Sequence, residues 1–297
     1  MISGNVPYHL VAAARTGFLE SMRQKTYPWQ SVAMTLNMGA KDIDLVDLGA
    51  APMPVNDAKV VQDFIEKRKQ ISAKEWNITV WISDNAVKDD QTGSLDRKVR
   101  SAGENFQKAI NKRVFQVLNA GDGQTYGPAY DGQDFFDSDH TDKGASYNTS
   151  QDNEDVLALS LDNFNTVWTT TQSVRDDQGE FTEYAYDLLV VHPSLWSVAM
   201  NITGNIQAMD TANREANPWS GLLKPPVSSP HLDSTAWYLI ASSEPIKPLI
   251  LAMKEQPHLQ HAWFDPQQED GGRHYFKFYA RYEVHYGNWR LAHQGNT

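Results

Sequence analysis

The chain has 297 residues, of which 40% are hydrophobic and 21% are charged, a balance typical of a globular protein. Its formal net charge of −11 argues against a dedicated nucleic-acid-binding protein, because phosphate binding needs a basic face. The absence of cysteine excludes disulfides, thiolate nucleophiles and Cys-ligated zinc. The sequence shows neither a secretory signal pattern nor an apolar run long enough to span a bilayer, so we expect a soluble intracellular protein without a membrane partner.

The first 83 residues predict two short helical segments and two strands. Apolar residues recur at helical spacing in residues 9–24, and we expect this helix to pack on another part of an assembly. Strand-like alternation in residues 42–48 and 76–82 predicts a two-stranded excursion, with a short helical run at 56–69 between the strands. Excursions of this length are usually functional or contact a neighbour. The candidate assembly residues are Trp76, Ile78, Val80 and Trp81.

The strongest secondary-structure prediction is a helix over residues 94–119, in which apolar residues repeat at steps of three and four. Ser94 is placed to cap its N-terminus, and Gly121 is placed to end it in the left-handed conformation. We expect one continuous helix that packs on a sheet of the same domain, with Phe106 as the central contact. Gly103 is its weak position, because glycine in a helix costs about 1 kcal/mol relative to alanine.

The second half of the chain predicts further helices and strands after a polar segment. Residues 121–155 are rich in Gly, Asp, Asn and Ser, and this composition predicts a surface loop. The predicted helices are 161–174 and 194–202, and the predicted strands are 186–191, 236–241, 275–286 and 289–293. The mixed order of helices and strands is typical of an α+β fold.

Two glycine-rich or acidic loops have the composition of ligand sites, and neither has the spacing that such a site needs. The phosphate-binding pattern G-x-x-x-x-G-K-[ST] is absent, and the glycines of residues 121–127 favour a helix stop and a turn. The acidic loop that begins at Asp137 fails as a calcium loop, because its sixth and twelfth positions are Asp142 and Asn148 instead of Gly and Glu. We therefore expect no bound cofactor and no calcium.

The histidines do not form a recognisable zinc site. His258 and His261 could share one face of a helix, but Pro257 disturbs that helix. A zinc site needs three clustered ligands, and the remaining histidines lie on other predicted elements, at His274, His285 and His293. The sequence therefore predicts no metal ligand and no catalytic residue, and the protein is not expected to be an enzyme.

One block of sequence is distinctive. The segment Tyr130-Asp-Gly-Gln-Asp-Phe-Phe-Asp-Ser-Asp-His140 follows the predicted 94–119 helix, and Ile82-Ser-Asp84 and Asp89-Asp90 precede that helix. With these residues the chain resembles the Mu-like phage major head subunit family, whose members have a very similar Tyr-Asp-Gly-Gln-Asn-Phe-Phe-Asp block ending in Glu-His. Shorter matches are Leu161-Asp-Asn-Phe164, Leu188-Leu-Val-Val-His-Pro193 and Lys247-Pro-Leu-Ile250.

The chain departs from that family at two points. Thr141 stands where the family more often has proline. The Lys247–Ile250 segment follows the Leu-Asp-Asn helix here, whereas it precedes that helix in the family.

The resemblance implies the Hong Kong 97-like major capsid fold of tailed phages. That fold consists of an N-terminal arm, an extended two-stranded loop, a peripheral domain with a long spine helix, and an axial domain. The corresponding ranges are 1–38 for the arm, 39–83 for the extended loop, 84–155 and 235–297 for the peripheral domain with its 94–119 spine, and 156–234 for the axial domain.

The implied function is that of a major capsid protein, which self-assembles into an icosahedral shell of hexamers and pentamers. The shell would enclose the double-stranded DNA genome of a tailed phage without sequence-specific binding. Portal and scaffold proteins are the other expected partners, and the protein would reach the virion after assembly in the host cytoplasm.

Two alternatives remain open from the residues. Abundant Trp, Tyr, Asp and His would also suit a carbohydrate-active or other hydrolase, which would need an enclosed pocket with paired carboxylates. Another virion component, such as a decoration or tail protein, would be distinguished from a shell subunit by its lower copy number.

Overall fold

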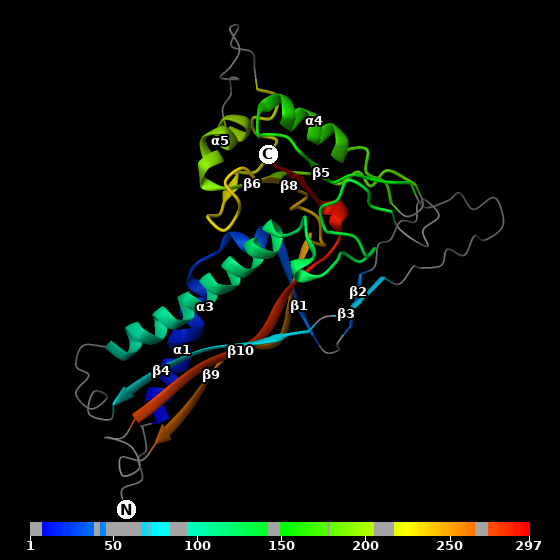
Figure 1. The fold of residues 1–297 in the computed structure, drawn as a ribbon. Coiled ribbons are helices and arrows are strands. Elements are labelled where there is room, and N and C mark those ends of the chain that lie inside the picture. Colours follow the sequence, from blue (N-terminus) through cyan, green and yellow to red (C-terminus); the bar gives the residue numbers. More distant parts are fainter. Residues whose placement is uncertain are drawn as a thin grey trace, which may run out of the picture.

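The computed structural model describes residues 8–38, 42–45, 67–70, 72–83, 94–141, 149–176, 179–204, 217–264 and 273–297. Figure 1 shows two units, one below the other. The long-sheet unit contains a four-stranded sheet and two helices, and the short-sheet unit contains a five-stranded sheet with two shorter helices. In the part of the chain that the structure describes, every helix is too short or too polar to serve as a transmembrane span.

The sheet of the long-sheet unit has the strand order β1-β9-β10-β4. Its strands are β1 (Ala33–Asn37), β9 (Leu249–Phe264), β10 (Arg273–Tyr286) and β4 (Lys74–Ser83). β1 is parallel to β9, and the other two pairings are antiparallel. Side chains alternate between buried and half-buried along most of β10, because successive residues of a strand point to opposite faces. The sheet therefore has an inner face, which is packed, and an outer face.

Helices α1 (Tyr8–Gln24) and α3 (Ser94–Asn119) cover the inner face of this sheet (Figure 1). α3 is continuous from its first to its last residue, so the predicted long helix is confirmed. Its apolar stripe lies in the core, and Phe106 is 2% exposed, as expected for the central contact.

α1 crosses α3 at Gly103. A methyl group on Gly103 would lie 2.0 Å from Ser21 Oγ and 2.8 Å from the Phe18 carbonyl oxygen, so the helices can approach this closely only with glycine here. The Phe18 ring stacks on Phe278 at 4.5 Å and meets Phe106 edge-on at 6.1 Å. The prediction that this helix packs on another part of an assembly is wrong, because its apolar face is buried on its own chain.

Polar contacts also join α3 to the sheet. Glu283 of β10 accepts a hydrogen bond from Arg113 of α3 at 2.7 Å, and its second oxygen lies 3.0 Å from Nζ of Lys74 on β4. The Tyr286 hydroxyl lies 3.0 Å from the Val117 carbonyl oxygen, which belongs to the last turn of α3 and has no partner within the helix. These contacts fix the C-terminal half of α3 against β10.

The predicted excursion at residues 39–83 pairs differently from our expectation. The strands at 42–45 and 76–82 are confirmed, but they do not pair with each other. β2 (Asp42–Leu45) pairs with β3 (Lys67–Gln70), and β4 pairs with β10. The alternating apolar residues of β4 match the buried face of β10, and this match sets the pairing. Of the helical run predicted at 56–69, the last three residues lie in β3 and the others lie outside the described residues.

β9 was not predicted, and it passes through Pro257. Two residues, Gln256 and Pro257, face the single residue Ala280 of β10, which makes a β-bulge. β1 ends opposite Met253, so the missing N–H group of Pro257 leaves no hydrogen bond of the β1 ladder unmade. The proline that seemed to disturb a helix is instead accommodated in a long strand.

The sheet of the short-sheet unit has the order β5-β11-β8-β6-β7. Its strands are β5 (Glu154–Asp155), β11 (Ala292–Gly295), β8 (Trp237–Ile240), β6 (Leu188–Val191) and β7 (Val227–Ser228). Every residue of β6 and β8 is buried, so both faces of the sheet are covered. One face continues the core of the long-sheet unit, and the other packs on α4 (Leu161–Thr171) and α5 (Trp196–Gly204). The helices predicted at 161–174 and 194–202 and the strands predicted at 186–191 and 236–241 are confirmed, with ends shifted by a few residues. The strand predicted at 289–293 is wrong in its first part, because Trp289–Leu291 form a 3-10 helix and β11 begins only at Ala292.

Candidate functional site

The four candidate assembly residues lie on β4, which is an edge strand of the described sheet. Val80 is paired with Phe276 and Ile78 with Phe278, so these two side chains share the inner face with the buried side of β10. Both pack against the core and are half-buried. They therefore contribute first to the fold of their own subunit.

Trp76 also belongs to the inner face. Its ring stacks on Tyr282 with the ring centres 5.2 Å apart, and its Nε1–H donates to the Tyr282 carbonyl oxygen at 3.0 Å. A tryptophan with both its ring face and its N–H engaged is anchored to its own chain.

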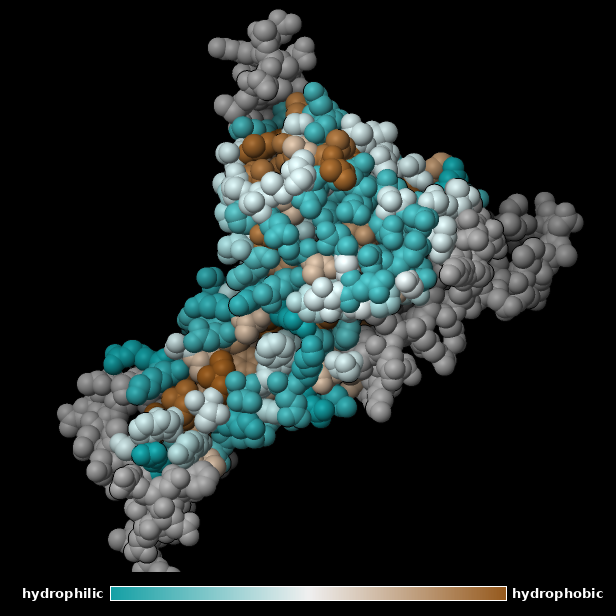
Figure 2. Space-filling model, in the orientation of Figure 1, coloured by the Kyte–Doolittle hydropathy of each residue, from teal (hydrophilic) through white to brown (hydrophobic). Residues whose placement is uncertain are grey.

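Trp81 differs from the other three because it points to the outer face. It is 54% exposed, and the Arg273 guanidinium lies over its ring at 4.7 Å. Figure 2 shows one side of the molecule, on which hydrophobic patches interrupt a largely hydrophilic surface. Among the exposed large hydrophobic side chains of the described residues, Trp81 is one that lies at a sheet edge. Trp81 is thus the candidate that the fold leaves available for another subunit.

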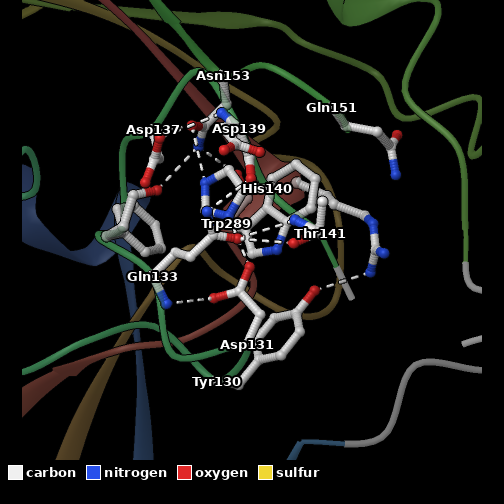
Figure 3. Close-up of polar contacts among 12 residues, drawn as sticks. Tyr130, Asp131, Gln133, Asp137, Asp139, His140, Thr141, Gln151, Asn153 and Trp289 are labelled. Carbon is white, nitrogen blue, oxygen red and sulfur yellow. Dashed lines mark hydrogen bonds and ion pairs between the residues drawn. The ribbon is translucent and has the colours of Figure 1, made fainter. Parts of the chain in front are cut away.

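A second site is the polar cluster built by the distinctive sequence block (Figure 3). Asn153 lies at its centre and is 1% exposed. Its side-chain N–H₂ group donates to the carbonyl oxygens of Phe135, Trp289 and Ala292 at 2.9 to 3.3 Å. Its side-chain oxygen accepts the Asp137 backbone N–H at 2.9 Å. One amide therefore ties the polar segment to the C-terminal part of the chain.

His140 is the second member of this cluster. Its ring stacks on Trp289 at 4.0 Å with an angle of 3° between the planes. Its Nε2 lies 3.1 Å from the Asn153 side-chain oxygen, and its Nδ1 lies 2.6 Å from Asp131 Oδ2. Because the Asn153 oxygen can only accept, His140 Nε2 is the donor in that bond.

The outer part of the block is held by Gln133. Its side-chain N–H₂ donates to the Asp139 carbonyl oxygen at 2.6 Å, and its side-chain oxygen accepts the Thr141 backbone N–H at 2.9 Å. The Tyr130 hydroxyl accepts a hydrogen bond from Arg290 at 2.8 Å. The prediction of a plain surface loop over residues 121–155 is therefore wrong for the block, because its polar side chains are bonded within the fold.

Gly121 has a different role from the helix stop that we expected. A methyl group on Gly121 would lie 2.4 Å from a ring carbon of Phe136, which is 1% exposed. Gly121 also does not have the positive φ of a left-handed helix end. Because Gly121 has no side chain, the buried Phe136 ring has room to pack beside the end of α3.

The Asp131–His140 pair has the spacing of a catalytic dyad, but a substrate cannot reach it. Both side chains are 0% exposed, and both ring nitrogens of His140 already have partners. A general base must reach the proton that it removes from a substrate. The arrangement stabilises the fold and gives no support to the hydrolase alternative.

The histidines lie on strands instead of a helix. His258 and His261 are both on β9, three residues apart and so on opposite faces. His261 Nε2 lies 3.3 Å from His274 Nδ1 across the β9–β10 pair. Burial lowers the pKa of His261, and the nearby His274 lowers it further. Within the described ranges, no group of three or more His, Asp or Glu side chains is arranged to hold a metal ion.

Carboxylates crowd together beside the polar cluster. Burial raises the pKa of Glu154, and four nearby carboxylates raise it further: Asp122, Asp137, Asp152 and Asp134. No cation forms an ion pair with any of these five residues among those that the structure describes. We refer to these five side chains as the acidic group.

Sequence reasoning did not find Asn153, Trp289 or the role of Gly103. Asn153 lies outside the recognised block, and Trp289 is 149 residues beyond His140 in number but stacks on it. Nothing in their spacing signals the contact. The one available signal is the high content of polar residues in the block. It indicates a polar surface loop, but it does not indicate that Asn153 and Trp289 contact this loop.

Comparison with known proteins identifies the family. The phage capsid protein family matches residues 66–291, which is more than half of the chain. No curated protein shows a significant match. Among solved structures, the procapsid of bacteriophage JBD30 is similar, with a TM-score of 0.56 and 19% identity, covering 98% of this chain and 76% of the other.

Two further shells show the same fold at lower identity. The virus-like particle from Pyrococcus furiosus has a TM-score of 0.53 and 9% identity over 97% of this chain and 99% of the other. The capsid of the cyanophage P-SCSP1u has a TM-score of 0.56 and 11% identity over 92% of this chain and 88% of the other. At these identities the similarity concerns the fold, which is α+β as the sequence predicted. The chain belongs to the phage capsid protein family and is a major capsid protein, a structural component of the virion and not an enzyme.

Proposed function

We propose that many copies of this chain assemble, as hexamers and pentamers, into an icosahedral shell that encloses the double-stranded DNA of a tailed phage. The observation that carries the proposal is the match to phage capsid proteins over residues 66–291. The likeness to assembled shells over nearly the whole chain supports it. Portal and scaffold proteins would be further partners, and assembly would take place in the host cytoplasm.

We further propose the Mu-like branch of this family and the Hong Kong 97-like arrangement of its parts. α3 would be the spine helix of a peripheral domain formed by residues 84–155 and 235–297. Residues 1–38 would form the arm, 39–83 the extended loop, and 156–234 the axial domain. β8 and β11, from residues 235–297, complete the five-stranded sheet, so the proposed peripheral and axial domains would share that sheet and its core.

In this proposal Trp81 is the interface residue of β4. An edge strand that exposes a tryptophan is a liability for a monomer, because it offers apolar surface and unpaired backbone groups to other chains. In a shell that surface would be covered by a neighbour. Trp76, Ile78 and Val80 would support the strand from its inner face and add to the contact only near the edge.

The test compares two tryptophans of the same strand. Trp81→Ala should fold like the wild type but assemble poorly, because its side chain is exposed in the subunit. Trp76→Ala should lower the free energy of unfolding by about 3 kcal/mol, since it removes a ring stacked on Tyr282. Size-exclusion chromatography with light scattering reports assembly, and urea unfolding of dissociated subunits reports stability.

The wild-type protein should elute as large particles in this experiment, well above the 33.5 kDa of a single chain. A wild type that remains a monodisperse monomer at all concentrations would contradict the shell. If Trp81→Ala forms normal particles, the proposal of a shell stands, but the proposal that Trp81 lies in an interface between subunits is contradicted.

A further inference from the structure

The outer face of β4 and β10 carries three further side chains near Trp81, namely Arg273, Lys277 and Tyr279. We infer that this basic face, formed by Trp81, Arg273, Lys277 and Tyr279, docks onto the acidic group of a second copy of the chain. The inference rests on the proposed function and names the partner surface for Trp81.

All four residues point to the same side of the sheet. The even-numbered residues of β10 from 274 to 282 are buried, so the odd-numbered residues Arg273, Lys277 and Tyr279 face outward. Trp81 is paired with Tyr275 and therefore faces outward too. The helices α1 and α3 lie on the opposite face of the sheet (Figure 1).

Two cations on this face keep their charge without a carboxylate partner. Arg273 lies over the Trp81 ring at 4.7 Å, and Lys277 lies over the Tyr279 ring at 4.9 Å. Neither has an ion-pair partner among the described residues, whereas the next cation, Arg281, lies 3.7 Å from Glu75. An aromatic ring attracts a cation and orients it, but the net charge remains. The basic face therefore combines two aromatic rings with two cations that have no ion-pair partner among the described residues, and Glu75 is hydrogen-bonded to Tyr279 at its border.

The acidic group supplies the complementary charge. Four of its carboxylates lie around the fifth, Glu154 of β5, and crowding of like charges there is unfavourable. In Figure 1 β5, which contains Glu154, lies in the short-sheet unit, whereas β10 begins with Arg273 at the end of the long sheet that lies farther from that unit. A single copy cannot join the two surfaces, so the contact must be made between copies.

A contact between two different surfaces of identical chains is heterologous, and such contacts generate rings or extended assemblies instead of closed dimers. Opposite potentials on the two surfaces would also guide the encounter and fix its register. DNA phosphates are the competing occupant of a basic face. The overall charge of −11 makes a second copy the better match, because every copy is an acidic partner.

Charge exchange tests the inference. R273E/K277E reverses the basic face, and D122K/E154K reverses part of the acidic group. Each double variant should lower the fraction of associated protein by about tenfold or more, because like charges then face each other. The quadruple variant restores opposite charges and the wild-type net charge, and it should regain association. R97E/K98E is the matched control, since these exposed residues lie near the start of α3, the helix that packs on the opposite face of the sheet.

Sedimentation velocity at low and high salt is the readout, with circular dichroism to show that each variant is folded. Wild-type association should weaken as salt screens the exposed charges. Normal association of R273E/K277E, or a folded quadruple variant that stays dissociated, would overturn the inference. Normal particles of R273E/K277E that have lost binding to duplex DNA would also overturn it, in favour of DNA.

The same measurement separates this inference from the shell. Short oligomers that disappear in both double variants and return in the quadruple variant would support the docking contact while contradicting a closed shell. Shells that form in every variant would support the proposed function and reject the contact. A wild type that is monomeric under all conditions would reject both.

Discussion

At the scale of single residues, close packing decides what each side chain contributes. Gly103 seemed the weak point of a helix, yet the space above it is filled by Ser21 and by the Phe18 carbonyl group. Asn153 seemed one more polar loop residue, yet it is 1% exposed and bonded to three carbonyl groups. In both cases the neighbour comes from a distant part of the sequence.

Gly103→Ala should destabilise the subunit by about 2 kcal/mol, although alanine is the better helix former. The added methyl group would lie 2.0 Å from Ser21 Oγ and force α1 away from α3. Gly123→Ala is the control, because nothing lies within 4 Å of the added group and its backbone is extended. Urea unfolding of dissociated subunits measures both. Equal stability of the two variants would show that the helices can separate without cost.

Asn153→Ala should lower the free energy of unfolding by about 2–4 kcal/mol, because it leaves buried carbonyl groups and the Asp137 N–H without a partner. The exposed Asn77→Ala is its control and should change stability by less than about 0.5 kcal/mol. Thermal unfolding monitored by circular dichroism measures the difference. If Asn153→Ala leaves the free energy of unfolding unchanged, water replaces the amide and the hydrogen bonds of Asn153 do not stabilise the loop.

At the scale of elements, one ion-pair cluster links three of them. Arg113 of α3, Glu283 of β10 and Lys74 of β4 meet at the edge of the inner face. Burial alone would raise the pKa of Glu283, but hydrogen bonds from Arg113, Lys74 and the Val284 N–H outweigh it and hold the pKa below its ordinary value. The carboxylate form is therefore the form that the folded state favours.

This shift predicts how stability depends on pH. A carboxyl group whose pKa is lowered by folding contributes stability above its unfolded value, near 4.5, and that contribution is lost as the pH falls through the folded value. Wild-type subunits should lose stability below that range, and Glu283→Gln should lose less. Urea unfolding across pH 3 to 7 measures the two curves. The control is Glu104→Gln, an exposed residue 3.9 Å from Lys108, which should keep the wild-type slope. Parallel curves for Glu283→Gln and wild type would contradict this assignment.

At the scale of the whole molecule, the two units share one core. Buried residues of α3 and of the four-stranded sheet are continuous with Leu188, Tyr238 and Ile240 of the five-stranded sheet. A continuous apolar core couples the unfolding of its parts. The subunit is therefore expected to behave as one cooperative body, even though Figure 1 shows two sheets.

Dissociated subunits should unfold in a single transition, with the same midpoint for tryptophan fluorescence and far-ultraviolet circular dichroism. Tyr238→Ala, in the shared core, should lower that one midpoint for both probes and cost about 3 kcal/mol or more. Trp168→Ala, on the α4 side of the second core, is the comparison and should also shift both probes together. Two separate transitions would show that the units unfold independently.

The sequence by itself determined many of the local elements, although not β9, and the class of protein. Periodicity alone predicted α3 over residues 94–119 and the strand character of β4, β6, β8 and β10, because these patterns depend on which side of an element meets the core. The block from Tyr130 to His140 indicated a capsid protein, and the family match confirms that function. Failed metal and phosphate motifs pointed in the same direction.

Only the tertiary structure decided which elements meet. It paired β4 with β10 instead of with residues 42–48, carried β9 through Pro257, and placed α1 on its own chain. It also divided the candidate assembly residues into an inner set and the outward-facing Trp81. The physical reason is that a period in the sequence fixes the face on which a side chain lies, whereas its partner is set by long-range packing, which pattern does not record.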